Sequence, residues 1–313
     1  MTLPKLSAHD RTAPTPPTVA RQLVHKHHAA EVLLTGWRRL GQDRFVVNAR
    51  WPGNHGFYAV RHSRHDPLLL SETVRQSFPL LAHEAYDVPF GHHLVWETYA
   101  WRLDPLALRA DGSDAEVELR VRAREVGRRR GGVALLSLAY DVVREGIPLA
   151  AASSRFTIQA PAVYRRLRGA RADQAAIRPI PAPPAVPAAS VGREDPCDVV
   201  LAPAGTGERW QLRVDTGHRV LFDHPVDHVP GMLLLEAARQ AARAVLGRPA
   251  GCVTAMDTRF HRYAELDAPT WIEARRTGAD AAGRPRLAVT GRQGDHTVYS
   301  CTVTLDETKP GPR

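Results

Sequence analysis

This sequence of 313 residues lacks the marks of a membrane protein, a secreted protein and a cysteine-based metal or redox protein. No apolar stretch reaches the length of a membrane-spanning helix, and the first twenty residues are polar, contain proline and have no signal-peptide core. The three cysteines, Cys197, Cys252 and Cys301, are widely spaced and follow no metal-ligand or redox pattern. We therefore expect a cytoplasmic protein with no metal, no cofactor and no membrane partner.

Lysine is also scarce, although the chain is strongly basic. The formal net charge is +9, yet the only lysines are Lys5, Lys26 and Lys309, and arginine supplies the other cations. Arginine binds phosphate and carboxylate groups in a bidentate fashion, which favours a phosphorylated substrate or an acidic protein partner. The composition of a GC-rich genome explains the same bias equally well. No helix-turn-helix pattern accompanies the charge, so we do not expect a nucleic acid partner.

A repeated polar cluster is the most informative feature that the sequence does contain. Two leucine-rich segments, beginning near Asp66 and Pro230, each end in a glutamate, then an arginine at i+3 and a glutamine at i+4. On a helix these three side chains share one face, and so apolar a helix is buried nearly all round. We therefore predict a duplicated domain with one cluster per copy: Glu72, Arg75 and Gln76, then Glu236, Arg239 and Gln240.

The segments around the two helices predict strands in both copies. Pro79 is expected to end or kink the first helix, whereas the second has no such proline and should span about 231–246. Long buried helices surrounded by antiparallel strands indicate an α+β fold. β-forming residues, alternation and turn signals predict strands at 31–35, 44–48, 116–123, 133–143, 155–159, 210–214, 219–222, 253–260, 271–276, 286–290 and 297–304.

Composition also predicts the domain boundaries. Residues 1–20 are expected to form a flexible arm. Residues 165–196, rich in arginine, alanine and proline, are expected to be an extended linker of partly polyproline character. The two repeats then occupy residues 21–164 and 197–307.

The segment that opens the second helix resembles a known signature. Residues 222–240 are similar to the run before and within the central helix of hotdog-fold β-hydroxyacyl-carrier-protein dehydratases. A more specific resemblance, from Val24 to Leu305, is to the actinobacterial A-factor (γ-butyrolactone) biosynthesis family, and segments 24–35, 66–76, 88–92 and 223–231 carry it. That family has two hotdog repeats joined by a linker, which implies two hotdog units paired as a pseudodimer within this chain.

The family resemblance implies an acyltransferase. It would move a β-ketoacyl group from an acyl carrier protein or CoA thioester to the hydroxyl of dihydroxyacetone phosphate, without a metal or redox cofactor. This is the committed step toward γ-butyrolactone-type signalling molecules. The family's active-site residues carry over to Glu72, Glu236 and Arg239, with Arg75 as the equivalent of Arg239. We expect the site to use Glu236 and Arg239, with Glu72 essential or supporting.

Such a transfer needs a base, donors for the developing oxyanion and a pocket that excludes water. Burial raises the pKa of a helix glutamate and the arginine at i+3 lowers it, and the sequence leaves the balance open. Backbone N–H groups at the start of the second helix are natural oxyanion donors. Further substrate contacts are expected from Arg75, Gln76, Gln240, Gly231, Met232, His224 and His228.

Other interpretations stay open. Each glutamate could simply pair with its arginine and help the helices pack. A dehydratase or thioesterase is an alternative, although the dehydratase histidine position holds Phe222 here and Tyr58 in the first repeat, unless a loop deletion restores His224. A non-catalytic regulator that binds an acyl ligand or DNA is another. A homodimer is a further option, although pairing within the chain is the default.

Two weaker motifs complete the sequence. The histidines at 25–28 and 92–93 lack the spacing and carboxylate partners of a metal site, so we interpret them as surface or strand residues. The segment Gly127-Arg-Arg-Arg-Gly-Gly132 is expected to be a solvated hairpin turn rather than a contact for nucleic acid or an acidic carrier protein.

Overall fold

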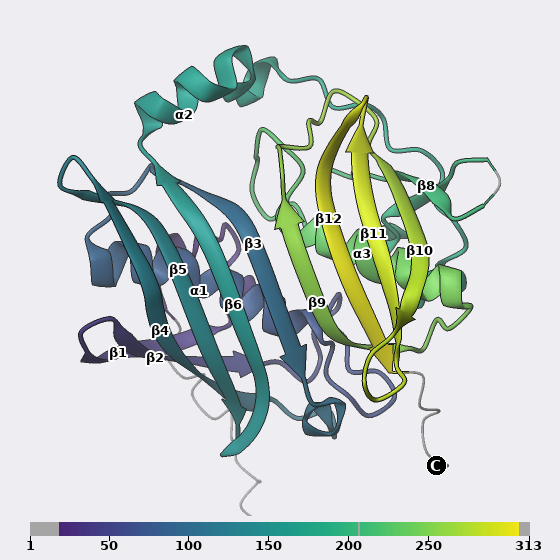
Figure 1. The fold of residues 1–313 in the computed structure, drawn as a ribbon, viewed down its shortest axis with the longest axis horizontal. Coiled ribbons are helices and arrows are strands. Elements are labelled where there is room, and N and C mark those ends of the chain that lie inside the picture. The colour runs from purple at the N-terminus through teal and green to yellow at the C-terminus, as the bar shows by residue number, and fades with distance from the viewer. Residues whose placement is uncertain (1–18, 206, 307–313) are drawn as a thin grey trace, which may run out of the picture.

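Strands from both repeats form one continuous sheet in this computed structural model, which describes residues 19–205 and 207–306. The predicted arm at 1–20 therefore lies almost entirely outside the described residues. The sheet has 12 strands in the order β1-β2-β4-β5-β6-β3-β9-β12-β11-β10-β8-β7, and helices α1 and α3 lie behind it in Figure 1. The strands are β1 Leu34–Gly41, β2 Arg44–Trp51, β3 His93–Leu103, β4 Ala115–Arg129, β5 Gly132–Arg144, β6 Ile147–Gln159, β7 Leu201–Pro203, β8 Arg209–Leu212, β9 Cys252–Phe260, β10 Trp271–Ala279, β11 Pro285–Gln293 and β12 His296–Asp306. The helices are α1 Leu68–Tyr86, α2 Pro161–Arg168 and α3 Gly231–Leu246.

The strand order shows the duplication directly. Read from its two edges, the sheet runs β1-β2-β4-β5-β6-β3 in the first repeat and β7-β8-β10-β11-β12-β9 in the second. The halves meet where β3 pairs antiparallel with β9, from Thr98 opposite Arg259 to Arg102 opposite Ala255. This arrangement confirms the predicted α+β fold of two units paired within one chain.

Helix α1 begins where the sequence predicted. Asp66 precedes it, and its carboxylate Oδ1 accepts a hydrogen bond from the backbone N–H of Leu68 at 2.8 Å. The helix does not end at Pro79 but contains it, which leaves a kink as the remaining prediction for this position. A proline inside a helix removes one hydrogen bond, but Leu80 and Leu81 beyond it are completely buried, and their burial favours continuation to Tyr86.

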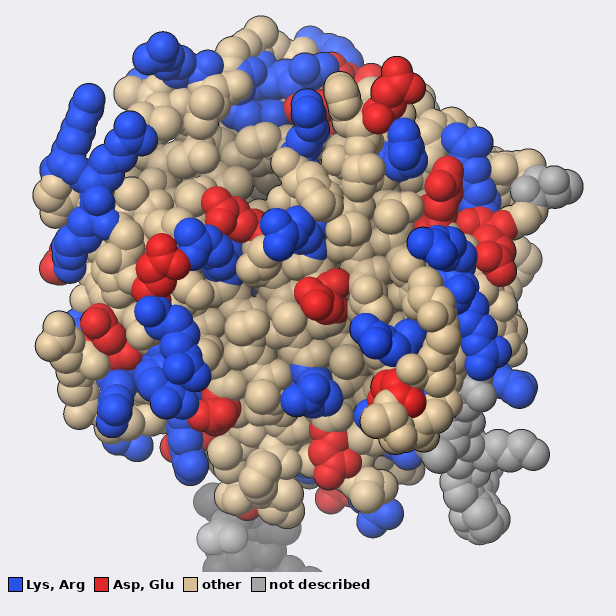
Figure 2. Space-filling view, viewed as in Figure 1, with Lys and Arg blue, Asp and Glu red and all other residues tan. Residues whose placement is uncertain are grey.

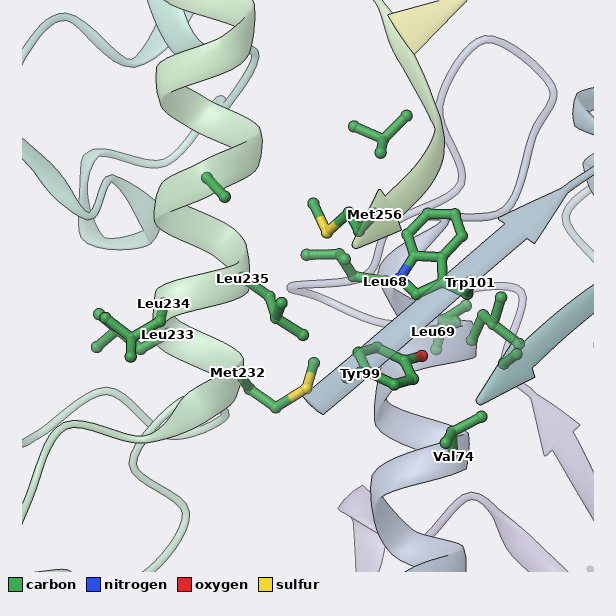
Figure 3. Close-up of a cluster of buried hydrophobic side chains, with 14 of the residues drawn as sticks. Leu68, Leu69, Val74, Tyr99, Trp101, Met232, Leu233, Leu234, Leu235 and Met256 are labelled. Carbon is green, nitrogen blue, oxygen red and sulfur yellow. The ribbon is translucent and has the colours of Figure 1, made fainter. Parts of the chain in front are cut away.

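An apolar core joins the two repeats between the central helices and strands β3 and β9. Figure 3 shows Leu68, Leu69 and Val74 of α1 near Tyr99 and Trp101 of β3, with Met232 and Leu235 of α3 and Met256 of β9 facing the same cluster. All of these side chains are buried. Burial of this kind stabilises the pair of repeats as one folding unit.

Several segments differ from the sequence predictions. Strands β3 and β7 were not predicted, and residues 219–222 form a turn rather than a strand. His218 explains that turn, because its Nδ1 accepts the backbone N–H groups of Val220 and Leu221 at 3.2 and 3.1 Å. The start of the predicted extended linker lies within helix α2, whose buried residues are Tyr164 and Arg168.

Candidate active site

One cavity of about 1240 Å³ lies between the repeats and is lined by both. The first repeat contributes Glu72 and Arg75 of α1 and the start of β3, and helix α2 closes part of the rim. The second contributes loop residues 220–229, the first residues of α3 and loop residues 261–265 after β9. Among the predicted site residues, Glu72, Arg75, His224, His228, Gly231 and Met232 line this cavity.

Glu72 is the centre of a compact ionic cluster on the cavity wall. Its carboxylate accepts two hydrogen bonds from Arg75, Nε to Oε2 at 3.0 Å and Nη2 to Oε1 at 2.8 Å. Lys26 Nζ lies 3.1 Å from Oε1, and Gln76 Nε2 donates to the same oxygen at 2.8 Å. Burial raises the pKa of Glu72, but Arg75 and Lys26 outweigh it and lower the pKa to about 2. Glu72 is therefore an anion, and the three charged groups together carry a net positive charge.

Gln76 fixes this cluster to the first repeat. Its side-chain oxygen accepts the backbone N–H of Leu33 at 2.9 Å, and its Nε2 also donates to the backbone carbonyl of Glu31 at 2.7 Å. The amide is fully used within the protein, so Gln76 orients Glu72 and does not line the cavity.

The equivalent cluster of the second repeat is sealed inside the protein. Glu236 and Arg239 are 0% and 1% exposed, and neither lines the cavity. Arg193 Nε donates to Glu236 at 2.9 Å, Arg239 pairs with the other carboxylate oxygen, and Arg239 also lies 2.5 Å from Asp66 of the first repeat. Burial raises the pKa of Glu236, but Arg193 and Arg239 hold it below its usual range.

The two clusters share a plan that extends beyond the predicted helix residues. In each repeat, one cation reaches the glutamate from outside its helix: Lys26 in the first and Arg193 in the second. Each of them follows a short 3₁₀ turn and one residue with positive φ, which is His25 at 51° before Lys26 and Gly192 at 72° before Arg193. Gln240 repeats the bonds of Gln76, because it accepts from Val200 N at 3.0 Å and donates to the Asp198 carbonyl at 2.8 Å. Sequence reasoning missed both cations, and it gave no reason to choose between an open and a sealed cluster.

His228 forms a second polar centre on the cavity wall. Its Nδ1 lies 2.6 Å from Asp227, and that carboxylate also accepts from Tyr164 Oη at 2.7 Å and from Arg168 Nε at 2.9 Å. Burial raises the pKa of Asp227, but hydrogen bonds from His228, Tyr164 and Arg168 hold it well below its usual range. The Asp227 carboxylate accepts the Nδ1 proton and so fixes the orientation of the His228 ring at the cavity. Sequence reasoning found His228 but not the three residues that orient it.

His224 is held less firmly. Its Nδ1 lies 3.6 Å from Asp223, whose carboxylate accepts the backbone N–H groups of His27 and His28 at 2.5 and 3.2 Å. These bonds tie the 25–28 segment of the first repeat to the loop before α3. The histidine-rich segment is therefore a bridge between repeats at the cavity.

His25 and His83 share one hydrogen bond beside the Glu72 cluster. His83 Nδ1 lies 2.6 Å from the Val88 carbonyl and so donates its proton there, which leaves His83 Nε2 to accept from His25 Nε2 at 2.9 Å. Burial, followed by the proximity of His83, lowers the pKa of His25 to about 3. His25 is accordingly a neutral residue in this wall.

The start of α3 brings backbone donors to the cavity. The first N–H groups of a helix have no partner within the helix, and Gly231 and Met232 line the cavity at this point. A Cβ on Gly231 would lie 3.0 Å from the Trp96 ring, so glycine lets the helix start pack closely against that indole. The start of α3 therefore presents backbone N–H groups without helical partners beside the cavity.

The described residues contain no group of three or more histidine, cysteine or carboxylate side chains suited to hold a metal ion. Within that same part of the chain, no helix has the length and apolar character needed to cross a membrane.

Comparison with known proteins gives matches along almost the whole chain. A family model described as the A-factor biosynthesis hotdog domain matches residues 7–160 and 172–308. A 2-oxo-3-(phosphooxy)propyl 3-oxoalkanoate synthase of Streptomyces virginiae is 44% identical over 289 residues, 91% of this chain and 97% of the relative. A synthase of the same name from Streptomyces coelicolor is 44% identical, and the match covers 91% of this chain and 91% of that protein. Another from Streptomyces griseus is 41% identical, and the match covers 94% of this chain and 96% of that protein.

Solved structures agree on the fold. A protein assigned as an oleoyl thioesterase of Lactobacillus plantarum superposes with a TM-score of 0.55 at 14% identity, covering 87% of this chain and 100% of that one. An acyl-ACP thioesterase of Bacteroides thetaiotaomicron gives a TM-score of 0.51 at 11% identity, covering 83% and 98%. With the family match, these similarities confirm the predicted hotdog fold.

Proposed function

The chain belongs to the A-factor biosynthesis hotdog family, and from this premise we propose that it is an acyltransferase that esterifies dihydroxyacetone phosphate with a β-ketoacyl group. The name of its relatives describes the product of that reaction. The acceptor hydroxyl oxygen forms the new ester bond with the acyl carbonyl carbon, and the thioester C–S bond breaks. The thiol leaves with the proton that the hydroxyl gives up. The product is a precursor of γ-butyrolactone-type signalling molecules.

The observation that carries the proposal is a single cavity that collects a cationic cluster, an oriented histidine and a helix N-terminus. Its volume of about 1240 Å³ lies above the roughly 300–1,000 Å³ of ordinary small-molecule sites, so an acyl chain and a small phosphorylated acceptor fit together. Both repeats line it, which gives a reason for the two units to occur in one chain.

His228 is the base in this proposal. Glu72, the helix glutamate that lines the cavity, is a poor base, because an anion whose pKa lies near 2 has little affinity for a hydroxyl proton at neutral pH. Imidazole is suited to that task, and Asp227 fixes the tautomer and stabilises the imidazolium that forms. The protonated His228 then returns the proton to the leaving thiolate.

Glu72 is essential in a different way. It holds Arg75 and Lys26 together on the cavity wall, and the net positive charge of the three groups attracts the phosphate of the acceptor. Arg75 retains 20% exposure of its side chain and is the group that a phosphate reaches first. The backbone N–H groups of Gly231 and Met232 stabilise the oxyanion that develops on the acyl carbonyl.

Glu236, Arg239 and Gln240 support the site from within the protein. Their bonds fix α3 to Arg193, and the Arg239–Asp66 pair fixes α3 to the beginning of α1. The network therefore contributes to the stability of the fold, away from the cavity. We therefore place the catalytic centre at the Glu72 cavity, and not at the Glu236–Arg239 pair favoured by the sequence.

Mass spectrometry of the products tests the function. Purified wild type, Glu72→Ala and Glu236→Ala proteins are incubated with a β-ketoacyl thioester, with and without dihydroxyacetone phosphate. We expect the phosphorylated ester from the wild type only when the acceptor is present, and none from Glu72→Ala. The folded fraction of Glu236→Ala, measured well below its melting temperature, should still form ester. Free acid or a dehydrated acyl chain formed regardless of the acceptor would show a thioesterase or a dehydratase instead.

A cytoplasmic location belongs to the same proposal, and the three free cysteines are consistent with a reducing compartment. The internal pairing of β3 with β9 supports one chain as the functional unit. The homodimer raised by the sequence is tested by sedimentation of the purified protein.

A further inference from the structure

Helix α2 is fixed across the rim of the cavity by its inner side. Tyr164 and Arg168 face inward, and Arg168 binds Asp227 at 2.9 Å and Glu265 through two bonds of 2.7 and 2.8 Å. The Tyr164 ring stacks on His93, with the ring centroids 3.5 Å apart. Because these contacts reach both repeats, α2 is a rigid part of the rim rather than a loose linker.

The outer side of α2 leaves large apolar side chains uncovered. Val163 and Leu167 of α2 are 49% and 64% exposed, and Phe90 is 62% exposed. Phe90 lies near the start of α2, because a Cβ on the next residue, Gly91, would be 3.9 Å from Pro161. These three are half of the six large hydrophobic side chains that are exposed among the described residues. Leu167 also lines the cavity, so this apolar surface is continuous with the cavity mouth.

Basic side chains border this surface. Arg165 and Arg166 are exposed on α2, whereas Arg171, just beyond the helix, pairs with Glu265 and Asp267. No aspartate or glutamate occurs between Glu145 and Asp173 in the sequence. Figure 2 shows basic side chains along the edge of the molecule where Figure 1 places α2. An exposed apolar patch bordered by arginines is typical of a protein-binding surface that selects an acidic partner.

We propose that the outer face of α2, with Phe90, docks an acyl carrier protein whose acidic surface surrounds its thioester arm. This inference rests on the proposed function, because the partner must deliver an acyl group into the cavity that α2 borders. The nucleotide of coenzyme A would engage arginine but would leave Val163, Leu167 and Phe90 exposed to water. A carrier protein covers the apolar residues and pairs its carboxylates with Arg165 and Arg166.

Steady-state kinetics with two donors that carry the same β-ketoacyl chain tests the docking surface. One donor is the acyl carrier protein thioester and the other is the coenzyme A thioester. The variants are Arg165→Glu/Arg166→Glu and, separately, Val163→Ser, which does not line the cavity, and the matched control is Arg275→Glu/Arg276→Glu, two adjacent exposed arginines on β10. We expect KM for the carrier donor to rise on the order of tenfold in both α2 variants, with kcat and the coenzyme A reaction unchanged. The control should behave as wild type.

Three results would overturn the docking surface: an equal loss with both donors, an unchanged KM for the carrier donor, or a wild type that uses only coenzyme A. The proposed function fails separately, through absence of the phosphorylated ester from either donor with wild type. Raising the salt concentration adds an independent check, since it should raise KM for the carrier donor in the wild type and much less in the charge-reversed variant.

Discussion

Neutralising the two equivalent glutamates should affect stability very differently. In Glu236→Gln, the guanidinium groups of Arg193 and Arg239, each with 1% side-chain exposure, lose their common counter-ion. Arg239 keeps Asp66, and Arg193 keeps only Asp198, at 3.9 Å. Breaking a buried ion pair from one side typically costs about 3–5 kcal/mol, because a charge is left buried without compensation. We expect a loss in the free energy of unfolding of that order.

In Glu72→Gln the remaining cations can be hydrated from the cavity. Arg75 keeps 20% exposure of its side chain, and both Lys26 and Arg75 line the cavity. The loss should therefore fall between the values for exposed and buried pairs, at about 1–2 kcal/mol. Activity should show the reverse order, with ester formation lost in Glu72→Gln and retained by folded Glu236→Gln.

Denaturant unfolding followed by circular dichroism measures the stability difference, and the product assay on the same preparations measures activity. The wild type and Arg275→Glu/Arg276→Glu serve as references. Equal destabilisation by the two glutamine variants would refute the distinction between an open and a sealed cluster. So would a Glu236→Gln protein as stable as the wild type.

Three more outcomes follow from the site. His228→Asn should lower kcat by roughly 10²- to 10⁴-fold, and an unchanged kcat would exclude His228 as the base. The pKa of His25 is about 3 in the folded protein and 6.5 in the unfolded chain, so between these pH values only the unfolded chain binds a proton at His25. Stability should therefore fall as the pH drops from 6.5 toward 3, and less steeply in His25→Gln, which parallel unfolding series would show. A thiol reagent should modify only the exposed Cys197 in the native protein, because burial raises the pKa of Cys252 to about 11 and that of Cys301 to about 12, whereas all three should react in guanidinium.

Much of the fold could be predicted because the repeat is local. The apolar run and the Glu-x-x-Arg-Gln spacing lie within single helices, so periodicity identified α1 and α3 and their equivalence. Strand β3 escaped prediction because its first six residues are all half-buried, which hides the alternation of an ordinary strand. It lies in the middle of the sheet with the cavity beside it, an environment created only by pairing with β9.

The site was only partly predictable for a related reason. Nearly identical helix clusters become one open and one sealed site, because distant segments decide what covers them. Asp66 and Arg193 close the second cluster, while Lys26 reaches the first and leaves it beside the cavity. Likewise, Asp227 is held by Tyr164 and Arg168 of α2, a helix that crosses from the predicted first repeat into residues 165–196, where composition indicated only an extended linker.

The fate of the acyl group in isotopically labelled water tests the central claim most directly. Wild-type protein, a β-ketoacyl thioester and dihydroxyacetone phosphate are incubated in H₂¹⁸O, and the acyl products are analysed by mass spectrometry. Transfer to the acceptor hydroxyl predicts a phosphorylated ester as the main product, with little free acid carrying ¹⁸O in its carboxyl group. Free acid labelled with ¹⁸O, formed at the same rate whether or not the acceptor is present, would contradict the acyltransferase and show that water is the acceptor in this cavity.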